Sequence, residues 1–231
     1  MNILVTGANR GIGLEFVRLC AARGDQVFAG CRSADKATDL QALSAQYPGQ
    51  ITILAMEVSD EESLENCARQ VGSAASGLDL LINNAGINAG EETVMTFNAE
   101  KAAHVLMVNA ISPILVVQKF LSLLKAGTSP KVIMISSESG SISTMQQFRG
   151  YTYFGSKAAL NMFTRCLAWD PEAAGIISVT VHPGWVRTDM GGPTAHLSVT
   201  ESAGGILKLA DRLTAVENGK FLTWEGKEFP W

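Results

Sequence analysis

Tyr153 and Lys157 are the residues of this sequence whose types and spacing most directly suggest chemistry. They are four positions apart, about one helical turn, so their side chains would lie on one helix face. An ammonium group beside a phenol lowers a phenol pKa that is normally about 10, and such a tyrosine can act as a general acid or base. Tyr151 has Gly155 at the same spacing and lacks this partner. An exposed amphipathic pair is the alternative interpretation.

Two further groups of polar residues directly follow apolar runs. Ser136, Ser137, Ser139 and Ser141 follow residues 131–135, and any of the four hydroxyl groups could bind a substrate oxygen. Asn83, Asn84, Ala85 and Gly86 follow residues 78–82. Open α/β sheets bind ligands at the carboxyl ends of their strands, so Asn84, Ala85 and Gly86 are candidates to line a cofactor. A purely structural turn is the alternative for the two amides.

A glycine-rich turn, residues 6–13, follows the first apolar run and opens a helical pattern. The free N–H groups and the positive dipole end of such a helix can hold a pyrophosphate, which glycine allows the backbone to approach. Its spacing, G-x-x-x-G-x-G, differs from the standard dinucleotide pattern, and a structural strand-to-helix turn is the alternative. The candidate dinucleotide-binding residues are Gly7, Asn9, Arg10, Gly11, Ile12 and Gly13.

The choice between the two nicotinamide cofactors falls at the end of the second predicted strand. An acidic residue there would bind the free ribose 2′-hydroxyl of NAD(H), but residues 28–33 read FAGCRS. Arg32 can instead pair with a 2′-phosphate, assisted by Arg10. Two solvated surface arginines are the alternative. The pattern favours NADP(H) over NAD(H).

These residues need a scaffold, and strand-length apolar stretches alternate with helix-length amphipathic ones along the chain. The predicted strands are residues 2–6, 26–30, 51–55, 78–82, 131–135 and 176–181, with a possible seventh at 220–222. The predicted helices are residues 12–23, 36–46, 61–74, 99–124, bent at Pro113, 156–169 and 201–213. Continuous apolar strands indicate a parallel sheet covered by helices. We predict one α/β domain, residues 1–231, with a Rossmann fold: a doubly wound, mostly parallel sheet of about seven strands with helices on both faces.

Composition excludes several other classes of function. The net charge of -4 and the lack of a Lys/Arg run argue against a nucleic acid partner. Apolar runs such as residues 114–117 are far shorter than the roughly 20 residues that span a bilayer, so no membrane segment is expected. Four scattered cysteines and three histidines show no metal-ligand spacing. With no leader-like start, these features predict a cytoplasmic protein.

Taken in order, the motifs resemble the short-chain dehydrogenase/reductase family over essentially the whole chain. The glycine turn, Asn-Asn-Ala-Gly, Asn109, Ser-Ser and Tyr-x-x-x-Lys occur in the family's order. Residues 9–13, 182–192 and 218–221 are similar, more narrowly, to its C-factor and Sniffer-type carbonyl reductase branch. The resemblance implies a reductase that uses NADP(H) to convert a ketone or aldehyde to an alcohol, or the reverse.

The family's catalytic tetrad implies roles for four residues. Tyr153 would exchange the proton with the substrate, and Lys157 would bind the nicotinamide ribose and lower the tyrosine pKa. Ser137 would bind the substrate oxygen, with Ser139 as the alternative, and Asn109 would hold a water in a proton relay. Further cofactor contacts implied by the family are Glu57, where relatives often have aspartate, Val58, Pro183, Gly184, Val186 and Thr188.

The substrate pocket is expected between residues 141–150 and the segment after Pro183. Its candidate residues are Ser139, Met145, Phe148, Trp185 and Met190. Other functions remain open: a cofactor-binding signalling or sensor protein of the C-factor type, or a sugar-nucleotide epimerase or dehydratase, for which the chain is short. Family relatives often pair through helices that correspond to residues 99–124 and 156–169, which implies a homodimer or homotetramer.

Overall fold

The computed structural model describes residues 1–88 and 90–231, and its strands form one parallel sheet. The sheet has the order β3-β2-β1-β4-β5-β6-β7. Its strands are β1 (Asn2–Thr6), β2 (Gln26–Cys31), β3 (Ile51–Ala55), β4 (Leu80–Asn83), β5 (Lys131–Ile135), β6 (Ile177–His182) and β7 (Phe221–Thr223). Strand order reverses between β1 and β4, which opens a crevice at their carboxyl ends. The predicted doubly wound fold is confirmed.

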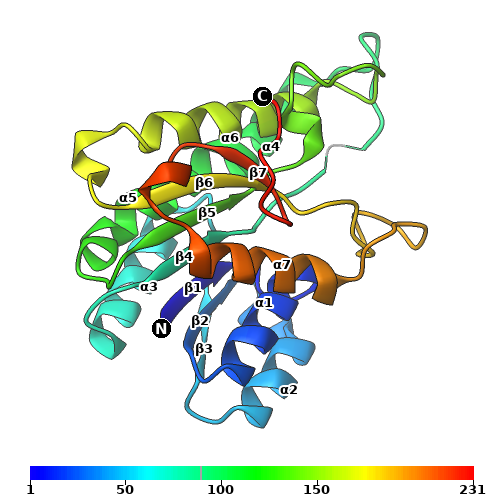
Figure 1. Ribbon diagram of the computed structural model, residues 1–231. Coiled ribbons are helices and arrows are strands. Elements are labelled where there is room, and N and C mark those ends of the chain that lie inside the picture. The colour runs from blue at the N-terminus through cyan, green and yellow to red at the C-terminus, as the bar shows by residue number, and fades with distance from the viewer. Residues whose placement is uncertain (89) are drawn as a thin grey trace.

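Helices cover both faces of the sheet because its strands are apolar on both sides. In β1, Ile3 and Val5 pack into one buried cluster and Leu4 into the other. The first cluster lies under α1 (Gly11–Ala22), α2 (Thr38–Gln46) and α7 (Val199–Arg212). The second lies under α3 (Glu61–Ala74), α5 (Ser112–Lys125) and α6 (Thr152–Leu167) (Figure 1). The two clusters account for the continuous apolar strands of the sequence.

The predicted helix at residues 99–124 is present but is not one continuous α-helix. It consists of α4 (Ala99–Leu106), the π-helical segment η2 (Met107–Ile111) and α5. Pro113 lies in the first turn of α5. A proline lacks the N–H group that would donate the next α-helical hydrogen bond, and the turn before it is a wider, π-helical turn. Asn109 is in this wider turn.

The helical stretch Ala99–Lys125 bears on the prediction that nothing in the chain spans a membrane, which stays a prediction. This stretch of 27 residues is long and apolar enough to cross a bilayer, although 50% of its most apolar window is buried inside the protein. Its α5 part packs Val116, Val117 and Phe120 into the core beneath the sheet. A buried core helix passes the same test of length and composition.

Other boundaries differ from the prediction by a few residues. The helix expected at 36–46 is split into a short 3-10 turn, η1 (Ala34–Lys36), and α2. α6 begins at Thr152, four residues before the predicted start, so Tyr153 lies inside the helix. Glu92, from the segment before α4, accepts hydrogen bonds from Tyr151 and Thr152 and so caps the helix at this earlier start. α6 exposes Met162 and Phe163, Trp169 is exposed just beyond its end, and the predicted oligomer through this helix stays a prediction.

Candidate active site

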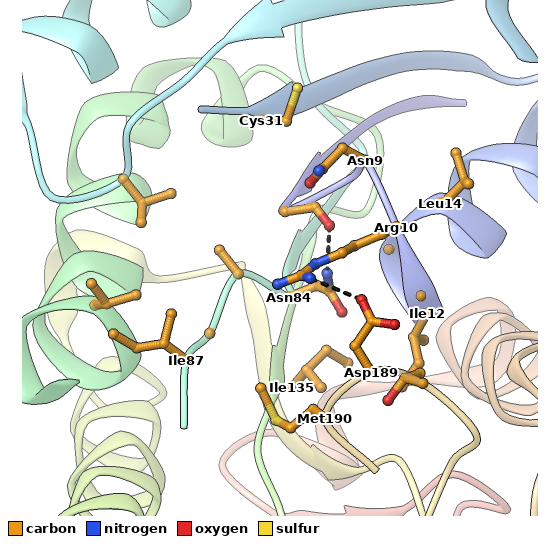
Figure 2. A pocket seen from close by; sticks show the side chains of 18 of the residues that line it. Asn9, Arg10, Ile12, Leu14, Cys31, Asn84, Ile87, Ile135, Asp189 and Met190 are labelled. Carbon is orange, nitrogen blue, oxygen red and sulfur yellow. Dashed lines mark hydrogen bonds and ion pairs between the residues drawn. The ribbon is translucent and has the colours of Figure 1, made fainter. Parts of the chain in front are cut away.

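A cleft of about 650 Å³ lies at the carboxyl edge of the sheet, between α1 and the segments that follow β2, β4 and β6 (Figure 2). The residues predicted from the sequence that line it are Gly7, Asn9, Arg10, Gly11, Ile12, Gly13, Arg32, Glu57, Val58, Asn84, Ala85, Gly86, Tyr153, Lys157, Pro183, Thr188 and Met190. The structure thus brings most of the predicted cofactor residues together. Lining residues that the sequence did not single out include Cys31, Asp39, Ile87, His104 and Asp189.

The glycine turn has a geometry that only glycine permits. Gly7 and Gly11 have φ angles of 64° and 56°. A Cβ on Gly13 would lie 2.1 Å from the Gly7 carbonyl oxygen, and a Cβ on Gly7 would lie 2.9 Å from the Ala85 Cα. The glycines therefore let the start of α1 approach β4 closely.

The start of α1 also differs electrostatically from the starts of other helices. Among the described residues, no side chain caps α1 and no acidic residue lies in its first turn. In contrast, α3 begins at Asp60, whose side chain accepts hydrogen bonds from the N–H groups of Glu62 and Ser63. The first turn of α1 thus keeps N–H groups and a dipole end that suit an anion.

Asn84 fastens this turn to β4. Its Nδ2 donates to the carbonyl oxygens of Thr6 and Gly7 at 3.0 and 3.1 Å. The Thr6 hydroxyl accepts from the N–H groups of Asn84 and Ala85, both at 3.0 Å. Asn83 points elsewhere and donates to the Pro113 carbonyl oxygen at 3.3 Å. Both amides make structural contacts, and Asn84 also lines the cleft, so its predicted contact with a cofactor stays a prediction.

Lys157 is a buried cation at the inner end of the cleft. Its side chain is 5% exposed, and its Nζ donates to the Ile135 carbonyl oxygen at 2.8 Å. Nζ lies 5.8 Å from the ring centroid of Tyr153, so the two residues do share one helix face. Burial lowers the pKa of Lys157 to about 8.

Tyr153 does not show the lowered pKa that the sequence predicted. Burial raises the pKa of its phenol, and a hydrogen bond with the Ser137 side chain opposes part of this rise. Desolvation by the surroundings is the larger cause, and the Lys157 ammonium group lies over the ring rather than beside the phenol oxygen. The phenol is therefore held in its protonated form at neutral pH.

The serines that follow β5 have different surroundings. Ser136 is buried and its hydroxyl donates to Asn161 Oδ1 at 2.7 Å. Ser137 is partly exposed and hydrogen-bonded to Tyr153, and its Oγ also accepts from the Ser139 N–H at 3.1 Å. Of these serines, Ser137 is the one whose side chain meets the tyrosine, which separates it from Ser139.

Asn109 holds the chain beside the lysine. It is 1% exposed; its Oδ1 accepts from the Ile87 N–H and its Nδ2 donates to the Ile87 carbonyl oxygen, both at 2.8 Å. Nδ2 also donates to Ser156 Oγ at 3.0 Å. A Cβ on Gly86 would lie 3.4 Å from Asn109 Oδ1 and 3.7 Å from Lys157 Nζ. Asn109 thus fixes the backbone beside Lys157, and the proton relay stays a prediction.

The outer end of the cleft carries the two arginines. Arg10 reaches across the cleft and its Nη1 meets Asp189 Oδ2 at 2.8 Å (Figure 2). Arg32 Nε lies 4.0 Å from Glu57 Oε2, while Glu57 Oε1 accepts from the Ser59 hydroxyl at 2.8 Å. All of these pairs are exposed or half-exposed, so water and salt weaken them.

Several predicted residues lie outside the lining of this cleft: Asn109, Ser137, Ser139, Met145, Phe148, Gly184, Trp185 and Val186. Trp185 donates its Nε1–H to the Gly191 carbonyl oxygen at 2.7 Å and packs against His196. Met145 and Phe148 are exposed. Of the predicted substrate residues, Met190 is the one that lines the cleft. Within residues 1–88 and 90–231, no group of three His, Cys, Asp or Glu side chains could hold a metal ion.

A sequence model of one family, described as short chain dehydrogenase, matches residues 1–196. The chain belongs to the short-chain dehydrogenase family. The matched region contains the cleft lining from the glycine turn through Met190. Membership confirms the family that the ordered motifs predicted.

Solved structures of family members match the whole chain. An NADPH-bound carbonyl reductase from chicken fatty liver is 41% identical, with a TM-score of 0.93 and coverage of 100% of this chain and 98% of that one. The carbonyl reductase Sniffer of D. melanogaster is 30% identical, with a TM-score of 0.93 and coverage of 100% and 99%. The C-signal protein of Myxococcus xanthus is 36% identical over 154 residues, which cover 67% of this chain and 93% of that protein. The chain is therefore similar to the C-factor and Sniffer-type branch of the short-chain dehydrogenase family.

Proposed function

We propose that this protein is an NADP(H)-dependent carbonyl reductase that converts a ketone or aldehyde to an alcohol. The observation that carries the proposal is that Tyr153 and Lys157 line the same cleft as the glycine turn, while Ser137, outside that lining, is hydrogen-bonded to Tyr153. Among the described residues, no side chain caps the helix that the glycine turn opens. The same cleft therefore offers an anion site and a proton donor. The carbonyl reductases among its structural relatives support this assignment.

The residues of the cleft fit a dinucleotide. The uncapped start of α1 suits the pyrophosphate, and Arg10 and Arg32 suit a 2′-phosphate at the outer end. A volume of about 650 Å³ is in the range of small-molecule sites. When bound, the nicotinamide supplies the hydride for reduction. A buried Lys157 with a backbone carbonyl as its acceptor suits the hydroxyl groups of the nicotinamide ribose.

The protein's own residues then handle the charge and proton on the substrate oxygen. Ser137 and Tyr153 donate hydrogen bonds to that oxygen, and Tyr153 transfers its proton as the alkoxide develops. A tyrosine whose pKa is not lowered holds its proton at neutral pH, as a general acid for reduction must. The Lys157 ammonium then stabilises the phenolate that remains, from 5.8 Å above the ring centroid.

Replacing Tyr153 by Phe tests the proposal. We expect the rate of NADPH oxidation with a panel of ketones and aldehydes to fall about 10²- to 10⁴-fold, the range for a lost general acid. NADPH affinity, measured by fluorescence titration, should stay within about twofold because the phenol oxygen is a small part of the cofactor site. Tyr151→Phe, two residues away, is the control and should retain activity. Undiminished reduction by Tyr153→Phe would overturn the proposal.

The similarity to C-signal favours one other function, a cofactor-binding signalling protein with little turnover. The same panel separates the two functions. A wild-type protein that binds NADPH tightly but reduces no carbonyl compound would support the signalling function. The coexistence of Tyr153, Lys157 and Ser137 in one site favours the reductase.

A further inference from the structure

Glu92 is a buried carboxylate that the proposed mechanism does not use. It lies in the segment between β4 and α4, and its side chain is 9% exposed. Its Oε1 accepts hydrogen bonds from the backbone N–H groups of Tyr151, at 2.7 Å, and of Thr152. Its Oε2 accepts from the Thr152 hydroxyl at 2.9 Å. Both carboxylate oxygens are therefore engaged by the two residues that precede Tyr153.

These hydrogen bonds supply the N-terminal cap of α6. The first N–H groups of a helix have no acceptor within the helix, and Tyr151, at the cap position, makes no side-chain cap among the described residues. Glu92 provides the acceptors from a segment 59 residues earlier in the chain. A carboxylate there also interacts favourably with the helix dipole. The hydrogen bond from the Thr152 N–H is the main cause that holds the pKa of Glu92 below its ordinary value.

Gly150 makes room for this contact. Its φ is 114°, a conformation that L side chains rarely adopt. A Cβ on Gly150 would lie 3.3 Å from Glu92 Cγ and 3.4 Å from its Oε1. The turn before α6 thus has the backbone conformation and the small residue that a close carboxylate requires.

Aromatic side chains from two loops pack against Tyr151 at the start of α6. Tyr151 packs edge-on against Phe97, with ring centroids 6.0 Å apart, and against Phe148, at 5.1 Å. Phe97 belongs to the segment of Glu92, and Phe148 to the loop at residues 141–150. Glu92 thus binds the start of α6 through hydrogen bonds, and Tyr151 packs at the same point against one residue from each of two loops.

We propose that Glu92 is a positioning residue for Tyr153. Tyr153 is the second residue of α6, next to the capped Thr152, whereas Lys157 lies one turn deeper and is held separately by the Ile135 carbonyl oxygen. Loss of the cap loosens the first turn and displaces the phenol, while the ammonium group stays in place. The inference rests on the proposed role of Tyr153 in carbonyl reduction.

The test compares Glu92→Ala with Glu91→Ala, its exposed neighbour, and with Glu92→Gln. Glu92→Ala should lower kcat about tenfold or more, because small displacements of a catalytic group are costly. NADPH affinity should stay within about twofold, since Lys157 and the glycine turn are untouched. Glu91→Ala should behave as wild type. Glu92→Gln should recover much of kcat, because its amide oxygen still accepts from the two N–H groups.

Amide hydrogen exchange gives a readout that does not depend on turnover. Exchange at residues 151–156 should be faster in Glu92→Ala than in wild type, with the rest of α6 unchanged. An unchanged kcat with unchanged exchange would overturn the inference, as would a parallel loss of kcat and NADPH affinity, which indicates general damage. If Glu92→Ala does not fold, the Glu92→Gln variant is measured alone. Wild-type values of kcat and of exchange at residues 151–156 in Glu92→Gln would support the cap, and a loss of protection throughout the protein would overturn it. A wild-type protein that reduces no carbonyl compound while Glu92→Ala accelerates exchange would refute the proposed function and leave the cap established.

Discussion

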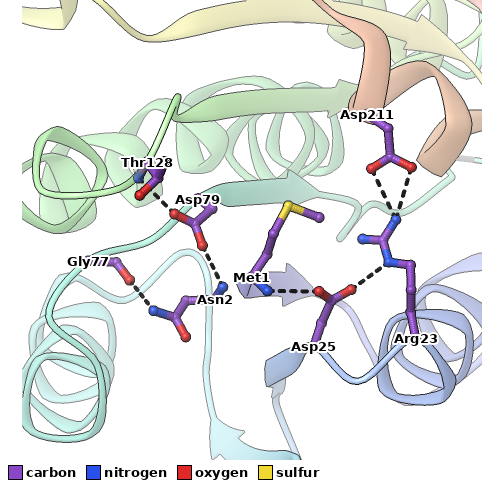
Figure 3. A network of polar contacts seen from close by, with 8 residues as sticks. All are labelled: Met1, Asn2, Arg23, Asp25, Gly77, Asp79, Thr128 and Asp211. Carbon is purple, nitrogen blue, oxygen red and sulfur yellow. Dashed lines mark hydrogen bonds and ion pairs between the residues drawn. The ribbon is translucent and has the colours of Figure 1, made fainter.

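The carboxyl and amino edges of the parallel sheet differ in whether their charged and polar groups have partners within the protein. At the carboxyl edge, Lys157 is buried against a backbone carbonyl, and the start of α1 has no side-chain cap in the part of the chain that the structure describes. At the amino edge, carboxylates lie among donors (Figure 3). Asp25 accepts from the Met1 amino group at 2.8 Å and from Arg23 Nε at 2.6 Å, and Arg23 continues to Asp211.

A second carboxylate, Asp79, links two segments at the same edge. Asp79 accepts from the N–H of Asn2 and from the N–H of Thr128, both at 2.7 Å, so it ties β1 to the loop before β5. Asn2 in turn donates its side-chain amide to the Gly77 carbonyl oxygen at 2.9 Å. The polar groups at this edge have their partners within the chain. One sheet can therefore use polar groups for stability at one edge and keep them available for a ligand at the other.

The largest expected effect separates activity from stability at the carboxyl edge. Lys157→Met should lower turnover about 10³-fold, yet raise the free energy of unfolding by about 2 kcal/mol at pH 7, because it removes a buried ammonium group. Burial sets the folded pKa at about 8, below the ordinary 10.5, so the cost is complete below about pH 8 and declines as the pH rises toward 10.5. The gain over wild type should shrink over that interval. Urea unfolding at several pH values measures this gain, and a Lys157→Met variant less stable than wild type at pH 7 would contradict the cost assigned to the buried ammonium group.

The next effect concerns the amino edge. Asp25→Ala should lower the free energy of unfolding by about 2 kcal/mol, because it leaves Arg23 and the Met1 amino group without their shared, buried acceptor. Turnover of the folded variant should be unchanged, since the cleft is at the other edge. Asp211→Ala removes a half-exposed partner of Arg23 and serves as the control, with a loss below about 1 kcal/mol. Thermal and urea unfolding measure both, and equal losses would contradict the role assigned to burial.

The smallest effect concerns cofactor choice at the carboxyl edge, where Arg32 lines the cleft. Arg32→Gln should raise the KM for NADPH about tenfold and leave the KM for NADH within about twofold, because an exposed arginine contributes mainly through the 2′-phosphate. Added salt should weaken NADPH binding to wild type more than to the variant. Initial rates at varied cofactor concentration measure both constants. An equal change in the two constants would argue against a 2′-phosphate at this position.

Local patterns predicted the fold and the inner site because their causes are local. The apolar strands, the glycine turn and the Tyr153–Lys157 spacing each depend on neighbouring residues. Glu92 escaped prediction because its partners at Tyr151 and Thr152 are distant in sequence. The direction of the Tyr153 pKa shift was predicted wrongly because burial is a property of the folded surroundings. The exposed positions of Met145 and Phe148 likewise depend on how a loop folds.

The π-helical segment η2 has a consequence for how this architecture can vary. One additional residue in a turn rotates the helix beyond it by about 100° relative to a continuous α-helix. α4 reaches the cleft through His104, whereas α5 buries Phe120 in the core. Substitutions in α4 can reshape the ligand side while α5 keeps its packing.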